Sequence, residues 1–257
     1  MMICLLQVLI PFFVSFSANV TSKDSNSVKV FTYNVGKGLD DGVIDLLSEV
    51  DADIVALQEA YRMFYQGSEV NISQLASLLS YGYFVSLEEH NQITYGLTIL
   101  SKYEIINSTF TKLPDAKNSL PRGFITAQIK INITVITVIT THLSWPTFYF
   151  NRLKQANKII DAVNFSVPTI VLGDFNTPNS IFDLTYWRLF TTFHDAWIAS
   201  GKPPFAGKTW HVSFPILRVD YIFVNDYCTV VKGSAELYKN ELSSDHKGFM
   251  VKLQFVK

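Results

Sequence analysis

The sequence predicts an α/β fold, a four-layered sandwich in which two mixed β-sheets pack face to face with helices on the outside. Short β-branched and apolar segments alternate with segments of helical spacing along most of the chain. Many of the strand-like segments are apolar throughout, which is typical of strands that are covered on both faces. Of the 257 residues, 48% are apolar and 17% are charged, so the chain can bury a sizeable core.

A single domain is expected over residues 28–257, because no repeat, low-complexity segment or linker follows Ser27. Helical spacing in its first half predicts helices over residues 41–50 and 72–79, the second capped by Asn71. The strands expected in this half span residues 28–33, 53–58, 82–87, 96–101 and 105–113.

The second half of the domain begins with two β-branched runs, residues 124–130 and 133–141, which predict a hairpin around Asn132. Apolar residues on one face predict a helix over residues 151–163. The remaining expected elements are strands over residues 167–172, 218–224, 229–239 and 247–255 and a helix over residues 180–190.

The apolar N-terminal segment, residues 1–18, predicts a cleaved secretory signal peptide, although it lacks the usual Lys or Arg. The alternative is an uncleaved membrane anchor, but the run is short and is broken by Gln7 and Pro11. Glycosylation sequons agree with a secreted or lumenal protein and begin at Asn19, Asn71, Asn107, Asn132 and Asn164.

Cysteine content and net charge exclude several function classes. Cys4 lies in the predicted signal peptide, so Cys228 is left without a disulfide partner and metal–thiolate chemistry is excluded. The formal net charge of −1 provides no strong basic field for nucleic acid, although a local basic groove is still compatible with it.

The segment Gly173-Asp174-Phe175-Asn176 directly follows the apolar run 167–172. On an extended backbone Asp174 and Asn176 would project to the same side, where they could hold a metal and hydrogen-bond an anionic oxygen. Taken alone, the pair is better explained by a strand, a turn over residues 177–180 and the start of a helix.

Similar polar residues stand at the ends of other expected strands, and the full order is Asn34, Glu59, Arg122, His142, Asp174, Asn176, Asp220, Asp245 and His246. The segments that carry this order are Thr32-Tyr33-Asn34-Val35, Leu57-Gln58-Glu59, Thr141-His142-Leu143, Gly173-Asp174-Phe175-Asn176, Val219-Asp220-Tyr221-Ile222 and Ser244-Asp245-His246. The order resembles the endonuclease/exonuclease/phosphatase superfamily, which includes deoxyribonucleases, abasic-site endonucleases, inositol-polyphosphate phosphatases and neutral sphingomyelinases. The resemblance extends from about Val28 to the C-terminus.

The resemblance implies a phosphoester hydrolase with Mg²⁺ as its cofactor, or Mn²⁺ in its place. Glu59, with Asn34 and Asp245, resembles the hard oxygen cage that such a metal prefers. His246 would work with Asp220, whose carboxylate would fix the tautomer of the imidazole and stabilise its protonated form.

The same resemblance assigns roles to four other residues. Asp174 would orient or deprotonate the attacking water, and Asn176 and His142 would hydrogen-bond the phosphate and its developing charge. Arg122 would contact the phosphate, because its planar fork suits phosphate oxygens. The other histidines, His90, His194 and His211, fit no motif, and we interpret them as structural or surface residues.

Two aromatic or basic segments are expected near the mouth of the site. Residues 145–150 follow His142 directly, and they could expose aromatic rings to a base or a lipid interface or form the buried start of the next helix. Residues 202–205 and 208–210 form a rim loop ahead of Asp220, and substrate choice resides in such loops.

These observations predict a secreted, Mg²⁺-dependent phosphodiesterase acting on a lipid or small-molecule headgroup, in peripheral contact with a lipid surface. We expect a monomer with no protein partner. One alternative is a secreted or lumenal nuclease, which the charge balance and missing disulfide disfavour. The other is a non-catalytic binding module, which is disfavoured because each position of the motif is present.

Overall fold

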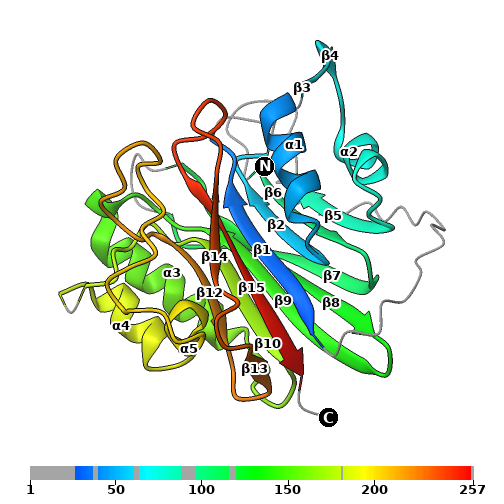
Figure 1. Ribbon diagram of the computed structural model, residues 1–257. Coiled ribbons are helices and arrows are strands. Elements are labelled where there is room, and N and C mark those ends of the chain that lie inside the picture. Colours follow the sequence, from blue (N-terminus) through cyan, green and yellow to red (C-terminus); the bar gives the residue numbers. More distant parts are fainter. Residues whose placement is uncertain are drawn as a thin grey trace, which may run out of the picture.

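Two large β-sheets form the centre of the molecule (Figure 1). The computed structural model describes residues 27–36, 40–60, 64–87, 96–115, 120–180 and 182–255. The expected signal peptide, the sequon at Asn19 and His90 lie outside the described residues.

The first sheet has seven strands in the order β13-β15-β1-β2-β6-β5, with β14 also pairing with β15. Its strands are β1 (Val28–Asn34), β2 (Ile54–Gln58), β5 (Tyr83–Leu87), β6 (Leu97–Ser101), β13 (Cys228–Val230), β14 (Glu236–Lys239) and β15 (Lys247–Phe255). Only β1 and β2 are parallel neighbours among these pairs, so the sheet is mixed.

The second sheet has six strands in the order β11-β12-β10-β9-β8-β7. Its strands are β7 (Glu104–Lys112), β8 (Gly123–Ile131), β9 (Thr134–His142), β10 (Thr169–Asp174), β11 (His194–Asp195) and β12 (Asp220–Val224). It is also mixed, since β9 and β10 run parallel. A small separate hairpin contains β3 (Phe64–Tyr65) and β4 (Ser68–Glu69).

Helices cover the outer face of each sheet, which confirms the predicted four-layered sandwich (Figure 1). The helices are α1 (Asp41–Val50), α2 (Ile72–Leu78), α3 (Tyr149–Asp161), α4 (Leu184–Phe190), α5 (Ala196–Ala199) and the short 3₁₀ helix η1 (Pro146–Phe148). In Figure 1, α1 and α2 lie on one side of the sheets, and α3 and α4 lie on the other.

Three apolar clusters fill the three interfaces between these layers. Alternate residues of β1 show the division, because Val30 belongs to the cluster between the sheets and Phe31 to the cluster under α1 and α2. Ile159 of α3 and Val171 of β10 belong to the third cluster, beneath α3 and α4. Many strands are apolar throughout because both of their faces are buried in these clusters.

The parallel pairs bring polar strand ends from both sheets to one end of the sandwich. Asn34 and Gln58 end β1 and β2, and His142 and Asp174 are paired at the ends of β9 and β10. The fully buried Gln58 amide donates to the hydroxyl of Thr140, on the second sheet, at 3.2 Å. This bond links the two sheets directly beneath those ends.

Two expected elements differ from the structure. The helix expected over 180–190 begins only at Leu184, because Asp183 caps it by accepting the N–H groups of Thr185 and Tyr186. The strand expected over 229–239 is divided into β13 and β14, which pair separately with β15 around a turn where Gly233 has φ 75°.

The expectations for Asn71 and Asn132 are confirmed. Asn71 caps α2 with a complete capping box, and Asn132 occupies the β8–β9 turn with φ 54°. Cys228 is a buried free thiol. Within the described ranges, we found no helix of the length and apolarity that a membrane crossing requires.

Gly173 permits the close approach of β10 to β9 beside the strand ends. It has φ 139°, and a Cβ atom at this position would overlap the carbonyl oxygen of Thr141. Gly201 also has a positive φ, 92°, but a Cβ atom there would meet no other group within 4 Å.

We therefore expect Gly201→Ala to cost about 1–2 kcal/mol of unfolding free energy through backbone strain alone. Gly173→Ala should cost about 1–3 kcal/mol more, because backbone atoms must move apart. Urea denaturation of both variants measures the difference. Equal losses would mean that the β9–β10 spacing is not set by Gly173.

Candidate active site

A pocket of about 610 Å³ opens at the end of the sandwich where the polar strand ends meet. Seven of the nine predicted site residues line it: Asn34, Glu59, His142, Asp174, Asn176, Asp245 and His246. These residues come from both sheets and lie up to 212 positions apart in the sequence, between Asn34 and His246. The fold thus assembles most of the predicted constellation in one place.

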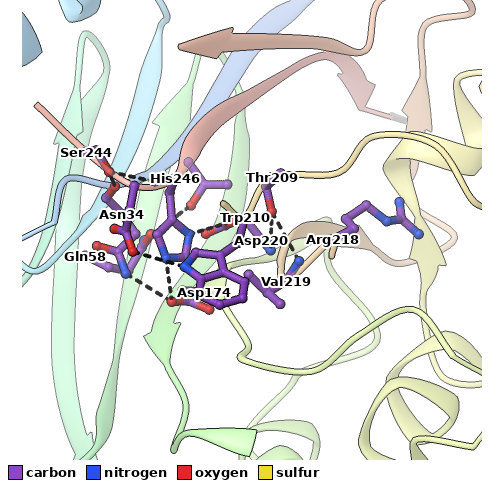
Figure 2. A network of polar contacts seen from close by, with 12 residues as sticks. Asn34, Gln58, Asp174, Thr209, Trp210, Arg218, Val219, Asp220, Ser244 and His246 are labelled. Atoms are coloured by element: carbon purple, nitrogen blue, oxygen red, sulfur yellow. Dashed lines mark hydrogen bonds and ion pairs between the residues drawn. The ribbon is translucent and has the colours of Figure 1, made fainter. Parts of the chain in front are cut away.

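His246 lies between two buried carboxylates (Figure 2). Its Nδ1 lies 2.8 Å from Oδ2 of Asp220, and its Nε2 lies 3.8 Å from Oδ2 of Asp174. Burial alone would lower the pKa of His246, but the Asp220 carboxylate, reinforced by Asp174, raises that pKa to about 10.

Two side chains contact Oδ2 of Asp174. The side-chain amide of Asn34 donates to Oδ2 of Asp174 at 3.0 Å, and Nε2 of His142 lies 3.2 Å from the same oxygen. Burial would raise the pKa of the Asp174 carboxyl, yet His142, His246 and Asn34 together hold it well below its usual value. Asp174 is therefore a stable anion.

Asp220 is fully buried and carries a raised pKa. Burial is the main cause, and the charge of Asp174 adds to it while His246 opposes both. Asp220 and His246 hence form one coupled pair around a shared proton. The second carboxylate, Asp174, favours the placement of that proton on the imidazole.

The predicted metal residues offer oxygen atoms to the pocket. The carboxylates of Glu59 and Asp245 line it, and the amide of Asn34 donates to Oε1 of Glu59 at 3.3 Å. The side-chain carbonyl oxygen Oδ1 of Asn34 accepts the N–H of Gly36, and its second lone pair can still bind a metal. This donor set suits Mg²⁺ or Mn²⁺, which take hard oxygen ligands.

A second group of potential ligands consists of Asp174, Asp220 and His246, whose ligand atoms lie within 4.8 Å of one another. An imidazole binds a metal only when it is neutral, however. Both nitrogens of His246 face carboxylates, an arrangement that favours the protonated ring over the neutral ring that a metal would need. Glu59 and Asp245 are the better candidates for a metal site.

The relative placement of Asp174 and Asn176 differs from the expectation for an extended backbone. Asn176 has φ 50°, and its N–H donates to Oδ1 of Asp174 at 2.8 Å, so the chain turns immediately after β10. Its side-chain amide donates to the carbonyl of Leu143. The turn, and not strand alternation, places both side chains at the pocket.

Arg122 and Asp220 are the two predicted residues that do not line the pocket. Asp220 lies behind His246 and acts on the pocket through that ring. Arg122 is buried just before β8, where its backbone N–H donates to Asp115. The structure places it near the strand end of His142 but assigns it no position in the pocket.

Three further residues contribute to the site, although the sequence alone assigned no individual role to any of them. Ser244 donates to the carbonyl of Asn34 and accepts the N–H of His246, so it ties two site segments together. The indole of Trp210 donates to Oδ2 of Asp245 at 3.0 Å. His211, interpreted from the sequence as structural or surface, also lines the pocket.

Apolar side chains also line the pocket. They include Trp145, Val212, Leu217 and Leu242, and Leu242 is 97% exposed. In the aromatic segment 145–150, Trp145 and Phe150 are exposed. Tyr149 and Phe150 are the first two residues of α3. Phe150 is 75% exposed and Tyr149 is only half-buried, so the alternative of a buried helix start is not borne out.

Comparison with known protein families decides the assignment. The model of the endonuclease/exonuclease/phosphatase family matches residues 31–246. The chain belongs to this family.

Solved structures agree with the family assignment at the level of the fold. An endonuclease/exonuclease/phosphatase from Beutenbergia cavernae is 22% identical, with a TM-score of 0.74, over 89% of this chain and 72% of that chain. The human Nocturnin catalytic domain is 19% identical, with a TM-score of 0.65, over 96% and 98% of the two chains. The mannosyl-6-phosphatase Bt3783 of Bacteroides thetaiotaomicron is 15% identical, with a TM-score of 0.65, over 89% and 100%. No curated protein matches the sequence.

Members of the endonuclease/exonuclease/phosphatase family are typically hydrolases of phosphoesters. The pocket has the parts that such chemistry requires: a fixed anion, a protonated imidazole and oxygen donors for a divalent metal. The pair of Asp220 and His246 is the part that can be tested most cleanly.

Asp220→Asn should lower kcat for a phosphodiester substrate by about 100-fold or more, because His246 loses the charge that keeps it protonated. Hydrolysis of bis(p-nitrophenyl) phosphate measures this. Asp226→Asn is the matched control, since Asp226 pairs with exposed His194 at 2.6 Å outside the pocket. A loss of less than threefold in Asp220→Asn would exclude the pair from the mechanism.

Proposed function

We propose that this protein is a Mg²⁺- or Mn²⁺-dependent phosphodiesterase that cleaves its substrate by attack of water. The observation that carries the proposal is the convergence of Glu59, Asp174 and His246 on one pocket. A non-catalytic binding module would not require a buried imidazole held between two carboxylates, since burying charge is costly.

Asp174 orients the attacking water in this proposal. Its carboxylate is kept ionised by His142 and His246, so it is a weak base but a strong hydrogen-bond acceptor. His246, as an imidazolium, stabilises the negative charge that develops on the phosphoryl oxygens. His142 lines the pocket and contacts Oδ2 of Asp174 through Nε2 at 3.2 Å, so it helps to hold that carboxylate in place.

The metal site of the proposal consists of Glu59 and Asp245 with Asn34. A bound Mg²⁺ or Mn²⁺ would supply positive charge to the phosphoryl oxygens and lower the pKa of a coordinated water. Trp210 supports this site from outside, because its indole N–H holds one oxygen of Asp245.

The apolar lining residues of the pocket favour a substrate with an apolar or amphiphilic group, such as a lipid headgroup ester or a small organic phosphodiester. Leu242 and Trp145 are exposed at the pocket, and Phe150 lies exposed in the adjoining helix α3. Such residues could also rest on a lipid surface. A nuclease is the less favoured alternative, since the net charge of −1 provides no general attraction to a polyanion.

We further propose that the protein is secreted or lumenal, glycosylated and monomeric. The four sequon asparagines within the described residues, Asn71, Asn107, Asn132 and Asn164, are all exposed, and none lines the pocket. Glycans at these positions would leave the pocket open. Intact-mass measurement of the secreted protein, with and without a glycosidase, tests both points.

The function is tested with purified protein containing residues 28–257, assayed with Mg²⁺ and with a chelator. The substrates are bis(p-nitrophenyl) phosphate, sphingomyelin, DNA and RNA. We expect chelator-sensitive hydrolysis, and Glu59→Gln should weaken the metal dependence while leaving the melting temperature within a few degrees. No hydrolysis by folded protein, or unchanged metal dependence in Glu59→Gln, would contradict the proposal.

The role of the apolar lining residues is tested with Leu242→Asp. We expect an increase in KM for sphingomyelin of about tenfold with little change in kcat, because the side chain contacts the substrate away from the reacting atoms. Ile133→Asp is the control, since Ile133 is 86% exposed in the β8–β9 turn, at the end of β9 opposite His142. Equal effects of the two substitutions would argue against a substrate contact at Leu242.

A further inference from the structure

Thr209 is a fully buried residue in the loop that leads to Trp210. Its hydroxyl oxygen accepts two backbone N–H groups, those of Val219 and Asp220, each at 3.2 Å (Figure 2). These two groups stand at the start of β12, where Asp220 is the first residue of the strand. The hydroxyl thus holds the backbone from which the Asp220 carboxylate projects.

The backbone of Thr209 makes two further contacts. Its carbonyl accepts the N–H of Lys247 at 2.8 Å, and its N–H donates to the carbonyl of Leu217 at 2.9 Å. Lys247 is the first residue of β15 and directly follows His246. One buried residue therefore contacts the backbone next to each member of the Asp220–His246 pair.

The two strands that Thr209 joins belong to different sheets. β12 lies in the six-stranded sheet, and β15 lies in the seven-stranded sheet. The contact of 2.8 Å between Nδ1 of His246 and Oδ2 of Asp220 crosses from one sheet to the other. Its length depends on how the two strand starts are held relative to each other, and Thr209 is bonded to both.

We propose that Thr209 is a positioning residue that sets the Asp220–His246 contact by linking the starts of β12 and β15. The inference rests on the proposed function in so far as that pair takes part in hydrolysis. Thr209 itself is absent from the pocket lining, so it acts through Asp220 and His246 and not on the substrate.

The hydroxyl is the critical group. A valine at this position would fill nearly the same volume but would leave the N–H groups of Val219 and Asp220 buried without an acceptor. The start of β12 would then move to find other partners. Displacement of a catalytic group by about 1 Å can lower a rate by about 100-fold.

The test compares Thr209→Val with Thr209→Ser, which keeps the hydroxyl. Thr169→Val is the matched control, because Thr169 is also fully buried and its hydroxyl donates to Val167 and Asn164 at the other end of β10. The measurements are kcat and KM with bis(p-nitrophenyl) phosphate, the melting temperature, and the downfield proton NMR signal of the His246 imidazole N–H, assigned with His246→Gln.

We expect Thr209→Val to lower kcat by about 10- to 100-fold with a nearly unchanged KM, and to shift or broaden the imidazole N–H signal. Thr209→Ser should restore both, and Thr169→Val should change neither. The inference is overturned if the imidazole N–H signal is unaltered in Thr209→Val. It is also overturned if Thr169→Val or Thr209→Ser loses as much kcat as Thr209→Val.

The NMR measurement separates this inference from the proposed function. If the wild-type protein hydrolyses no phosphodiester, the proposed function fails. The imidazole signal still reports whether Thr209 positions the pair, because it requires no substrate.

Discussion

The site depends on a positive imidazole held between two buried carboxylates that belong to the opposite sheet. His246 immediately precedes β15 of the seven-stranded sheet, while Asp174 and Asp220 are paired on β10 and β12 of the six-stranded sheet. All three side chains are buried, and buried charges are tolerated only when they are paired. The two sheets must therefore meet in one register at this end, because a shift would leave a buried charge without its partner.

The remaining architecture supports this contact from both sides. Gln58 bonds to Thr140 across the sheets beneath the site, and the amide of Asn34 reaches across them to Asp174. Ser244 ties the loop before His246 to the end of β1. The polar groups thus form a connected network at one end of an otherwise apolar interface, which gives a rigid base to a pocket whose rim is exposed and apolar.

Much of this arrangement is predictable from sequence because strand ends carry a strong signal. Asn34, Glu59, His142 and Asp174 follow or end apolar runs, and parallel strands place such ends together. The hairpin at Asn132 and the cap of α2 at Asn71 follow equally local rules. The family resemblance then supplied the order in which these ends meet.

Tertiary contacts determine what the sequence could not predict. The turn at Asn176 depends on a hydrogen bond to the side chain of Asp174, which strand periodicity does not encode. Thr209 and Trp210 lie in an irregular loop, and their roles come from bonds to residues at least ten positions away. Arg122 was assigned by analogy of position, but burial places its side chain outside the pocket lining.

The most direct measurement of the central interaction is a ¹⁵N NMR titration of the His246 ring. We expect the imidazole to stay protonated through neutral pH and to titrate near a pKa of about 10. Titration near the ordinary value of 6.5 would contradict an imidazolium held between Asp174 and Asp220.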